Sequence, residues 1–252
     1  MRRNVVIGNW KMNGSVASVT TLVKKIIARG FGEKADCFLC PSFVHVKLVS
    51  DILNNSSSNI ELGAQDLSEQ IEGAFTGEVS GEMLSDLGAG LVLVGHSERR
   101  QRFDEKNYLV AEKYKAARAV GLIPVLCVGE TQIERENGET EKVVGQQLRV
   151  IVEECGSELM KGSIVAYEPI WAIGTGLTAT PEQAQAVHGF LRETLSECSS
   201  ALADETRLIY GGSVKADNAT QLFEQRDIDG ALIGGASLDA EQFLSIWESA
   251  ER

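Results

Sequence analysis

The 252-residue chain lacks the features that would take it out of the ordinary globular class. No apolar run approaches about 18 residues, the minimum for a membrane span. The N-terminus combines two arginines with an apolar stretch of only three residues, so we expect no signal peptide, no membrane partner and a cytoplasmic location. No linker, low-complexity segment or shift in composition divides the chain, which predicts one domain over residues 1–252.

Basic side chains are in short supply. The chain has 24 Lys and Arg against 36 Asp and Glu, which gives a net charge of −12. This balance argues against an extended basic surface for nucleic acid, although a small basic pocket is compatible with it. An anionic ligand would meet an unfavourable overall field, so the groups that bind it must act locally.

Cysteine is scarce and odd in number, with five residues in the chain. Only Cys37 and Cys40 form a C-x-x-C pair, and they lie in an apolar, strand-like run that turns the two side chains to opposite faces. Buried reduced thiols are therefore favoured over a redox or zinc role. A dinucleotide-binding fingerprint is lacking as well, because Gly174-Thr175-Gly176 has no third glycine.

Short apolar runs do recur along the whole chain, and they alternate with segments of helical periodicity. We predict strands at Val5–Gly8, Ala35–Cys40, Ile60–Ala64, Leu91–Gly95, Ile123–Val128, Ser163–Tyr167, Arg207–Tyr210 and Ala231–Gly234. Eight strand–helix units that fill 252 residues predict a closed (β/α)8 barrel, with an open doubly wound sheet as the alternative. The strands are almost continuously apolar, as expected when helices cover a parallel sheet.

Two of the helical segments carry clear signals. Pro181–Leu195 has Thr180 as a candidate N-cap and a proline at its first position. The segment Glu105–Val120 is also predicted to be a helix. Four of its residues would lie near one face: Tyr108, Ala111, Tyr114 and Ala119.

Unusual polar residues follow the carboxyl ends of several predicted strands, which is where α/β barrels place their active sites. Asn9 and Lys11 follow the first strand. Because they are two residues apart, they share one side of an extended segment, and both could point into a common cleft. A lysine there suits a phosphate or a developing oxyanion, although a solvated surface lysine is the simpler alternative.

After the fourth strand, His96 precedes a predicted helix start, with Ser97 as a candidate N-cap and Glu98 in the first turn. The partial positive charge and the N–H donors of a helix N-terminus disfavour protonation of an imidazole. This predicts a neutral His96 that donates a hydrogen bond as a weak electrophile, with a structural histidine as the alternative. His45 and His188 lack this context, and we interpret both as structural or surface residues.

After the sixth strand, Glu168 ends an apolar run. Such a carboxylate is costly to desolvate unless it is paired or functional, and desolvation raises its pKa toward that of a useful base. The loop that begins at Pro169 is apolar and contains two glycines, so it could fold over a site and exclude water. The alternative is a glycine-rich connector beside a salt-bridged glutamate.

Paired glycines follow the seventh and eighth strands, at Gly211-Gly212 and Gly234-Gly235, and Ser213 adjoins the first pair. Glycine lets backbone N–H groups approach an oxyanion closely, and these two barrel loops often bind phosphate together. Plain turns are the alternative for either pair alone.

Together these segments resemble the triosephosphate isomerase family, whose members are TIM barrels. The matching motifs run in order from residue 8 to about 236, at Asn9–Gly14, Gly73–Glu78, Gly95–Arg100, Leu126–Glu130, Ala166–Gly176 and Tyr210–Val214. The resemblance implies an isomerase of glycolysis and gluconeogenesis that interconverts dihydroxyacetone phosphate and D-glyceraldehyde 3-phosphate. It implies neither a metal nor an organic cofactor.

The same resemblance implies a role for each site residue. Glu168 would move a proton between adjacent carbons through an enediolate, neutral His96 would polarise the carbonyl, and Lys11 and Asn9 would stabilise and orient the enediolate. The phosphate would be held by backbone N–H groups of Gly174, Ser213, Gly234 and Gly235. A lid over Pro169–Leu177 would be held closed by Tyr210 and Ser213.

The family resemblance also implies a homodimer in which the loop Gln65–Ser80 inserts into the partner. Thr76 would support the polar pair after the first strand of the other subunit, and Glu78 would pair with Arg99 across the interface. Two residues depart from the family pattern. Leu177 replaces a frequent lysine at the end of the lid, and Asp66 replaces a frequent asparagine in the interface loop.

Two other functions stay open at this point. Another phosphate-binding barrel enzyme would use the same glycine pairs, but it would not explain the set formed by Asn9, Lys11, His96 and Glu168. A non-catalytic binding scaffold would have no need of a desolvated carboxylate beside a phosphate site.

Overall fold

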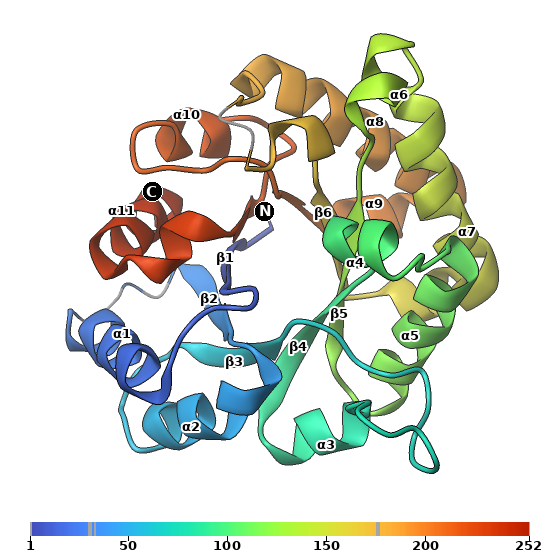
Figure 1. Cartoon of the computed structure of the whole chain (residues 1–252). Coiled ribbons are helices and arrows are strands. Elements are labelled where there is room, and N and C mark those ends of the chain that lie inside the picture. Colours follow the sequence, from blue (N-terminus) through green and yellow to red (C-terminus); the bar gives the residue numbers. More distant parts are fainter. Residues whose placement is uncertain (1, 30–31, 33, 175–176, 252) are drawn as a thin grey trace.

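The computed structural model describes residues 2–29, 32, 34–174 and 177–251 of the chain. Its parallel strands close into a barrel in chain order, and the last strand pairs back onto the first (Figure 1). The strands are β1 (Asn4–Asn9), β2 (Ala35–Cys40), β3 (Glu61–Ala64), β4 (Ala89–Val94), β5 (Ile123–Val128), β6 (Ile164–Tyr167), β7 (Arg207–Tyr210) and β8 (Gly230–Ile233). The predicted barrel is confirmed, the open sheet is excluded, and the predicted strand bounds are correct to within two residues.

Helices surround the barrel as an outer ring (Figure 1). They are α1 (Val16–Ala28), α2 (Phe43–Asn54), α3 (Gly81–Asp86), α4 (Ser97–Arg102), α5 (Asn107–Ala119), α6 (Gln132–Glu136), α7 (Thr140–Met160), α8 (Pro181–Cys198), α9 (Ser200–Glu205), α10 (Ala219–Phe223) and α11 (Ala240–Ala250), with 3-10 turns η1 (Ile170–Ala172) and η2 (Gly235–Leu238). In the described residues, no helix is both long enough and apolar enough to span a bilayer.

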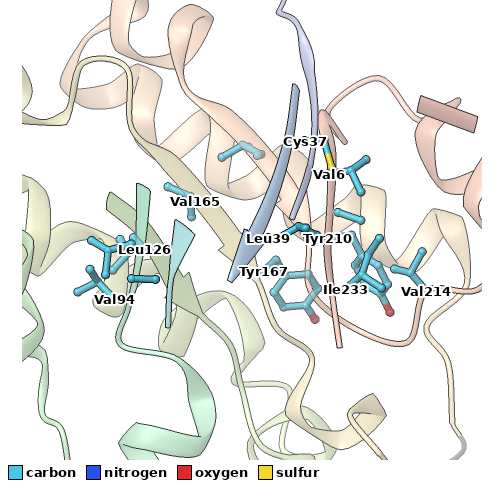
Figure 2. Packing of buried hydrophobic residues seen from close by; sticks show 14 of the residues in the cluster. Val6, Cys37, Leu39, Val94, Leu126, Val165, Tyr167, Tyr210, Val214 and Ile233 are labelled. Carbon is cyan, nitrogen blue, oxygen red and sulfur yellow. The ribbon is translucent and has the colours of Figure 1, made fainter. Parts of the chain in front are cut away.

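Alternation along each strand builds two apolar layers. One set of side chains fills the barrel interior: Val5, Ile7, Phe38, Cys40, Leu91, Leu93, Val125, Cys127, Ile164, Ala166, Ile209 and Leu232. The intervening residues, among them Val6, Leu39 and Val165, pack outward against the helices (Figure 2). Both faces of the strands are thus buried, which explains their nearly continuous apolar sequence. Cys37 lies in the outer layer and Cys40 in the inner one, as free thiols on opposite faces.

The N-terminal signals of α8 are confirmed. Thr180 caps the helix in a reciprocal capping box with Gln183, and Pro181 occupies the first turn. The predicted face of α5 is partly wrong, because Tyr108 and Ala119 are exposed. The helix instead turns toward the core Val110, Ala111, Lys113, Tyr114 and Ala117.

The amino-terminal end of the barrel is closed by ion pairs. Arg192 on α8 donates to Asp227 and to Asp229, each at 2.8 Å, and also to the carbonyls of Ala203 and Thr206. A second group joins β2 to β7 through Asp36, which accepts from Arg207 at 2.6 Å. The first group ties α8 to the residues just before β7 and β8, and the second ties the first residues of β2 and β7 to each other across the barrel end.

Candidate active site

A cavity of about 440 Å³ opens at the carboxyl-terminal end of the barrel. Its walls come from the loops after β1, β4, β6, β7 and β8. Each site residue predicted from the sequence lines it: Asn9, Lys11, His96, Glu168, Gly174, Ser213, Gly234 and Gly235. Segments far apart in the chain therefore converge on one concave space, as the strand-end positions predicted.

Lys11 reaches this cavity in a different way from the predicted one. Its φ is +52°, in the left-handed region that non-glycine residues rarely occupy, so the segment is not extended. The Asn9 side chain accepts a hydrogen bond from the Lys11 N–H at 3.0 Å. The Gln65 carboxamide donates to the Lys11 carbonyl at 2.9 Å and to the Cys40 carbonyl at 2.8 Å. This Gln65 contact could not be predicted from the sequence, because it depends on two loops meeting.

The Lys11 ammonium is paired within the cavity. Its Nζ lies 2.6 Å from Oε1 of Glu98, in the first turn of α4. Both side chains keep partial contact with solvent, with exposed fractions of 26% and 42%. A substrate anion that approaches Lys11 must therefore share it with a carboxylate that is already present.

His96, and not Ser97, is the N-cap of α4, which corrects the prediction. Its Nδ1 accepts a hydrogen bond from the Glu98 N–H at 3.2 Å, so in the neutral ring the proton is on Nε2. That Nε2 lies 2.9 Å from Oε1 of Glu168. The helix N-terminus thus selects the tautomer as well as orienting the ring.

The pKa of His96 shifts in the opposite direction from the one predicted. Burial lowers the pKa of this imidazole, but the charge of Glu168 and its hydrogen bond outweigh burial and raise the pKa above its usual value. The sequence could not reveal this effect, because it depends on a carboxylate that comes from a strand two positions further around the barrel.

Glu168 is buried, as predicted, with an exposed fraction of 1%. Its Oε2 accepts a hydrogen bond from the Ser97 N–H at 2.8 Å. Burial raises the pKa of Glu168, but the contacts with His96 and Ser97 and the charge of Lys11 outweigh it, and the pKa lies below its usual value. The predicted increase is therefore wrong for this arrangement, in which the carboxylate is held ionised.

The two glycine pairs differ in what they make room for. A Cβ on Gly211 would come within 2.9 Å of the Glu168 Cγ, and one on Gly212 within 2.2 Å of the Tyr210 hydroxyl. The first pair thus lets the loop after β7 pack against the buried glutamate. A Cβ on Gly235 would meet nothing within 4 Å, and Gly234 faces only the Lys11 side chain. The second pair is open to the cavity.

The buried side chain of Glu130 contacts the first residues of the segment predicted to form a lid. Glu130 belongs to one of the motifs, but the motif did not indicate this role. Oε1 of Glu130 accepts from the Tyr167 hydroxyl at 3.0 Å and from Trp171 Nε1 at 2.9 Å. The Glu130 carbonyl accepts from the Ile170 N–H. Thr175 and Gly176, within the predicted lid, lie outside the described residues.

The loop Gln65–Ser80, which was predicted to form a dimer interface, is buried near its ends and exposed at its tip. Asp66, 5% exposed, accepts from Lys113 Nζ at 2.8 Å and from Arg99 Nε at 2.8 Å. Glu105 shares both cations, at 2.6 Å and 2.7 Å. Burial, more than the repulsion from Glu105, raises the pKa of Asp66 to about 6 despite the two cations. Residues 71–78 are all exposed.

The remaining histidines have structural contacts, as predicted. His45 Nε2 lies 3.2 Å from the Gly14 carbonyl, and buried His188 contacts the Ala184 carbonyl at 2.8 Å and the rings of Tyr167 and Tyr210. Across the described ranges, no group of three or more His, Cys, Asp or Glu side chains is arranged to hold a metal ion.

The fold and this cavity define the class of (β/α)8-barrel enzymes with a site at the strand carboxyl ends. Residues 4–250 match the family described as triosephosphate isomerase. The triosephosphate isomerase of Xanthomonas axonopodis pv. citri is 51% identical over 251 residues, and that of Halorhodospira halophila is 49% identical over 253, with 99% of both chains covered in each case. The chain belongs to the triosephosphate isomerase family.

Proposed function

We propose that the chain interconverts dihydroxyacetone phosphate and D-glyceraldehyde 3-phosphate through an enediolate, with Glu168 as the base and His96 as the electrophile. One observation carries the assignment of roles. A buried carboxylate, an imidazole with a defined tautomer and a lysine from three separate loops line one cavity with the open glycine pair Gly234-Gly235.

The contacts of Glu168 explain how one carboxylate can be ionised before substrate binds and basic afterwards. His96 and the Ser97 N–H stabilise the anion at rest. When the carboxylate turns to a substrate carbon, it leaves these partners but stays out of water. Loss of the favourable contacts with retention of burial raises its pKa, which favours proton abstraction.

The same movement sets the charge of His96. Once Glu168 turns away, burial and the nearby Lys11 remain, and both lower the pKa of the imidazole. His96 then acts as a neutral ring whose Nε2–H donates to the substrate carbonyl. Because Nδ1 is held by the Glu98 N–H, proton movement between the two substrate oxygens passes through Nε2 alone.

The phosphate would be bound by backbone N–H groups of Gly174, Ser213, Gly234 and Gly235, while Asn9 and Lys11 stabilise the enediolate. The lid over Pro169–Leu177, held closed by Tyr210 and Ser213, would exclude water. This exclusion matters because an enediolate phosphate exposed to solvent can eliminate phosphate instead of completing the isomerisation.

A cytoplasmic homodimer, each chain forming one domain over residues 1–252, is part of the proposal. Large apolar side chains on the segments that follow β1 to β4 are 44% to 94% exposed in the single chain: Met12, Val44, Ile71, Phe75 and Phe103. Such a grouping is typical of a protein interface. In the dimer, the exposed tip of Gln65–Ser80 would insert into the partner, bringing Thr76 to its active site and Glu78 to its Arg99.

Conversion of D-glyceraldehyde 3-phosphate by the purified chain, with Glu168→Ala as the control, tests this function. Fast turnover that is lost in the variant supports both the reaction and its base. A folded protein that binds inorganic phosphate but has no turnover would favour a binding scaffold, and turnover of a different phosphorylated substrate alone would favour another barrel enzyme. Light scattering should give twice the mass of one chain, and a fully active monomer would contradict the interface.

A further inference from the structure

A second lysine lines the cavity outside the proposed machinery. Lys215, in the loop between β7 and α10, borders the same space as Ser213, Gly234 and Gly235. Apart from His96, the ionisable residues of the lining are Lys11, Lys215 and two glutamates.

The two lysines differ in what already neutralises them. Lys11 forms a 2.6 Å ion pair with Glu98, while ionised Glu168 leaves the wall with a further negative charge. Lys215 is exposed, and within the described ranges no carboxylate lies within 4 Å of its ammonium. Apart from His96, the lining without Lys215 would hold one lysine against two glutamates, in a chain whose overall charge is already −12. A phosphate dianion that enters the cavity would then be repelled by the lining carboxylates and by the net charge of the whole chain.

The position of Lys215 is fixed by its backbone. Its N–H donates to Oδ1 of Asn218 at 2.8 Å, and the Asn218 carboxamide donates to the Ser213 carbonyl at 3.1 Å. The Lys215 carbonyl accepts from the Ala219 N–H at the start of α10. One turn therefore holds the lysine two residues from Ser213, a proposed phosphate donor. The neighbouring Asp217 is exposed and does not line the cavity.

We propose that Lys215 is a specificity residue that attracts the phosphate dianion to the cavity before the backbone N–H groups bind it. The inference rests on the proposed function and adds a residue to it. A cation at the mouth of the site raises the association rate of an anion and contributes little to the chemical step, and salt screens this contribution. Its effect therefore falls on kcat/KM at low ionic strength and spares kcat.

The test compares Lys215→Ala and Lys215→Arg with Lys24→Ala, which removes one exposed lysine on α1, away from the cavity lining, and so changes the net charge equally. At about 10 mM ionic strength, Lys215→Ala should lower kcat/KM for D-glyceraldehyde 3-phosphate about threefold to tenfold, with kcat unchanged. At about 0.5 M the difference should disappear. Lys215→Arg should retain wild-type values, and so should Lys24→Ala.

Two further measurements separate this inference from the proposed function. Slow turnover of unphosphorylated D-glyceraldehyde should be equal in wild type and Lys215→Ala, because no phosphate is attracted. Calorimetry with inorganic phosphate should give weaker binding to Lys215→Ala at low salt, and this needs no turnover at all. Wild-type protein without turnover would refute the proposed function and leave the calorimetric test intact. Equal behaviour of Lys215→Ala and Lys24→Ala, or a loss that persists at high salt, would overturn the role of Lys215.

Discussion

At the amino-terminal end of the barrel, the Arg192 guanidinium donates to two carboxylates and three carbonyls. At the carboxyl-terminal end, Glu168, His96 and Lys11 are also paired, but their partners line an open space of about 440 Å³. Buried charge is thus common to both ends. What distinguishes the candidate site is that its pairs can be exchanged for a ligand.

The largest effect is expected at Glu168. Glu168→Ala and the isosteric Glu168→Gln should lower kcat by about 10³–10⁴-fold, because each removes the proposed proton acceptor. Both variants should still fold, with a lower free energy of unfolding, because the contacts with His96 and the Ser97 N–H that outweigh the cost of burying the carboxylate are lost or weakened. Steady-state kinetics and urea unfolding on the same samples measure the effects on kcat and on the free energy of unfolding. Near-normal turnover in Glu168→Gln would contradict the base assignment.

The opposite result is expected at the amino-terminal end. Arg192→Ala leaves Asp227 without its half-buried cation and Asp229 with Arg2 alone, and it should lower the free energy of unfolding by about 3–5 kcal/mol, while kcat of the folded protein stays unchanged. Arg149→Ala, which removes an exposed partner of Glu197, is the matched control and should cost less than about 1 kcal/mol. Chemical denaturation at fixed protein concentration measures both. A variant that is stable but inactive would remove the distinction between the two ends.

A substitution of Lys11 tests whether turnover depends on this lysine leaving Glu98 to contact a bound anion. Lys11→Ala should lower kcat/KM by about 10²–10³-fold, because the enediolate loses its cation. Alanine at position 11 would adopt the same left-handed backbone conformation as the lysine does, with the same strain. The free energy of unfolding should therefore change little. Retention of both substrate affinity and turnover would return Lys11 to the role of a surface charge.

The sequence predicted the barrel and the residues that line the cavity. It was less successful in predicting the pKa shifts and backbone conformations of those residues. The eight candidate residues could be located because each follows a strand whose end can be recognised from an apolar run, and closure then brings them together. The directions of the pKa shifts of His96 and Glu168 could not be predicted. Each shift depends on the other residue, because His96 Nε2 lies 2.9 Å from Glu168 Oε1. The left-handed Lys11 is a further case, because its conformation is held by Gln65 from another loop.

The smallest effect is expected at Asp66, which lies at the carboxyl-terminal end of β3 but not in the cavity lining. Its pKa is about 6 in the folded chain against an ordinary value of 3.8, so between these values the folded chain keeps a proton that the unfolded chain has lost. Stability from this group is therefore complete below about pH 4 and lost as the pH rises through 6. The expected loss is up to about 3 kcal/mol.

Asp66→Asn should remove this dependence, because an amide does not titrate. Subtracting its free energy of unfolding from that of wild type cancels the other titrating groups, and the difference should grow in favour of wild type as the pH falls from 7 to 4. Asp51→Asn, at an exposed pair with Lys47, is the control, because an exposed ion pair contributes at most about 1 kcal/mol to stability. A difference that shrinks toward acid would mean that Lys113 and Arg99 overcome the cost of burying the carboxylate. Asp66 would then stabilise the fold as an ion pair, in the manner of the amino-terminal end of the barrel.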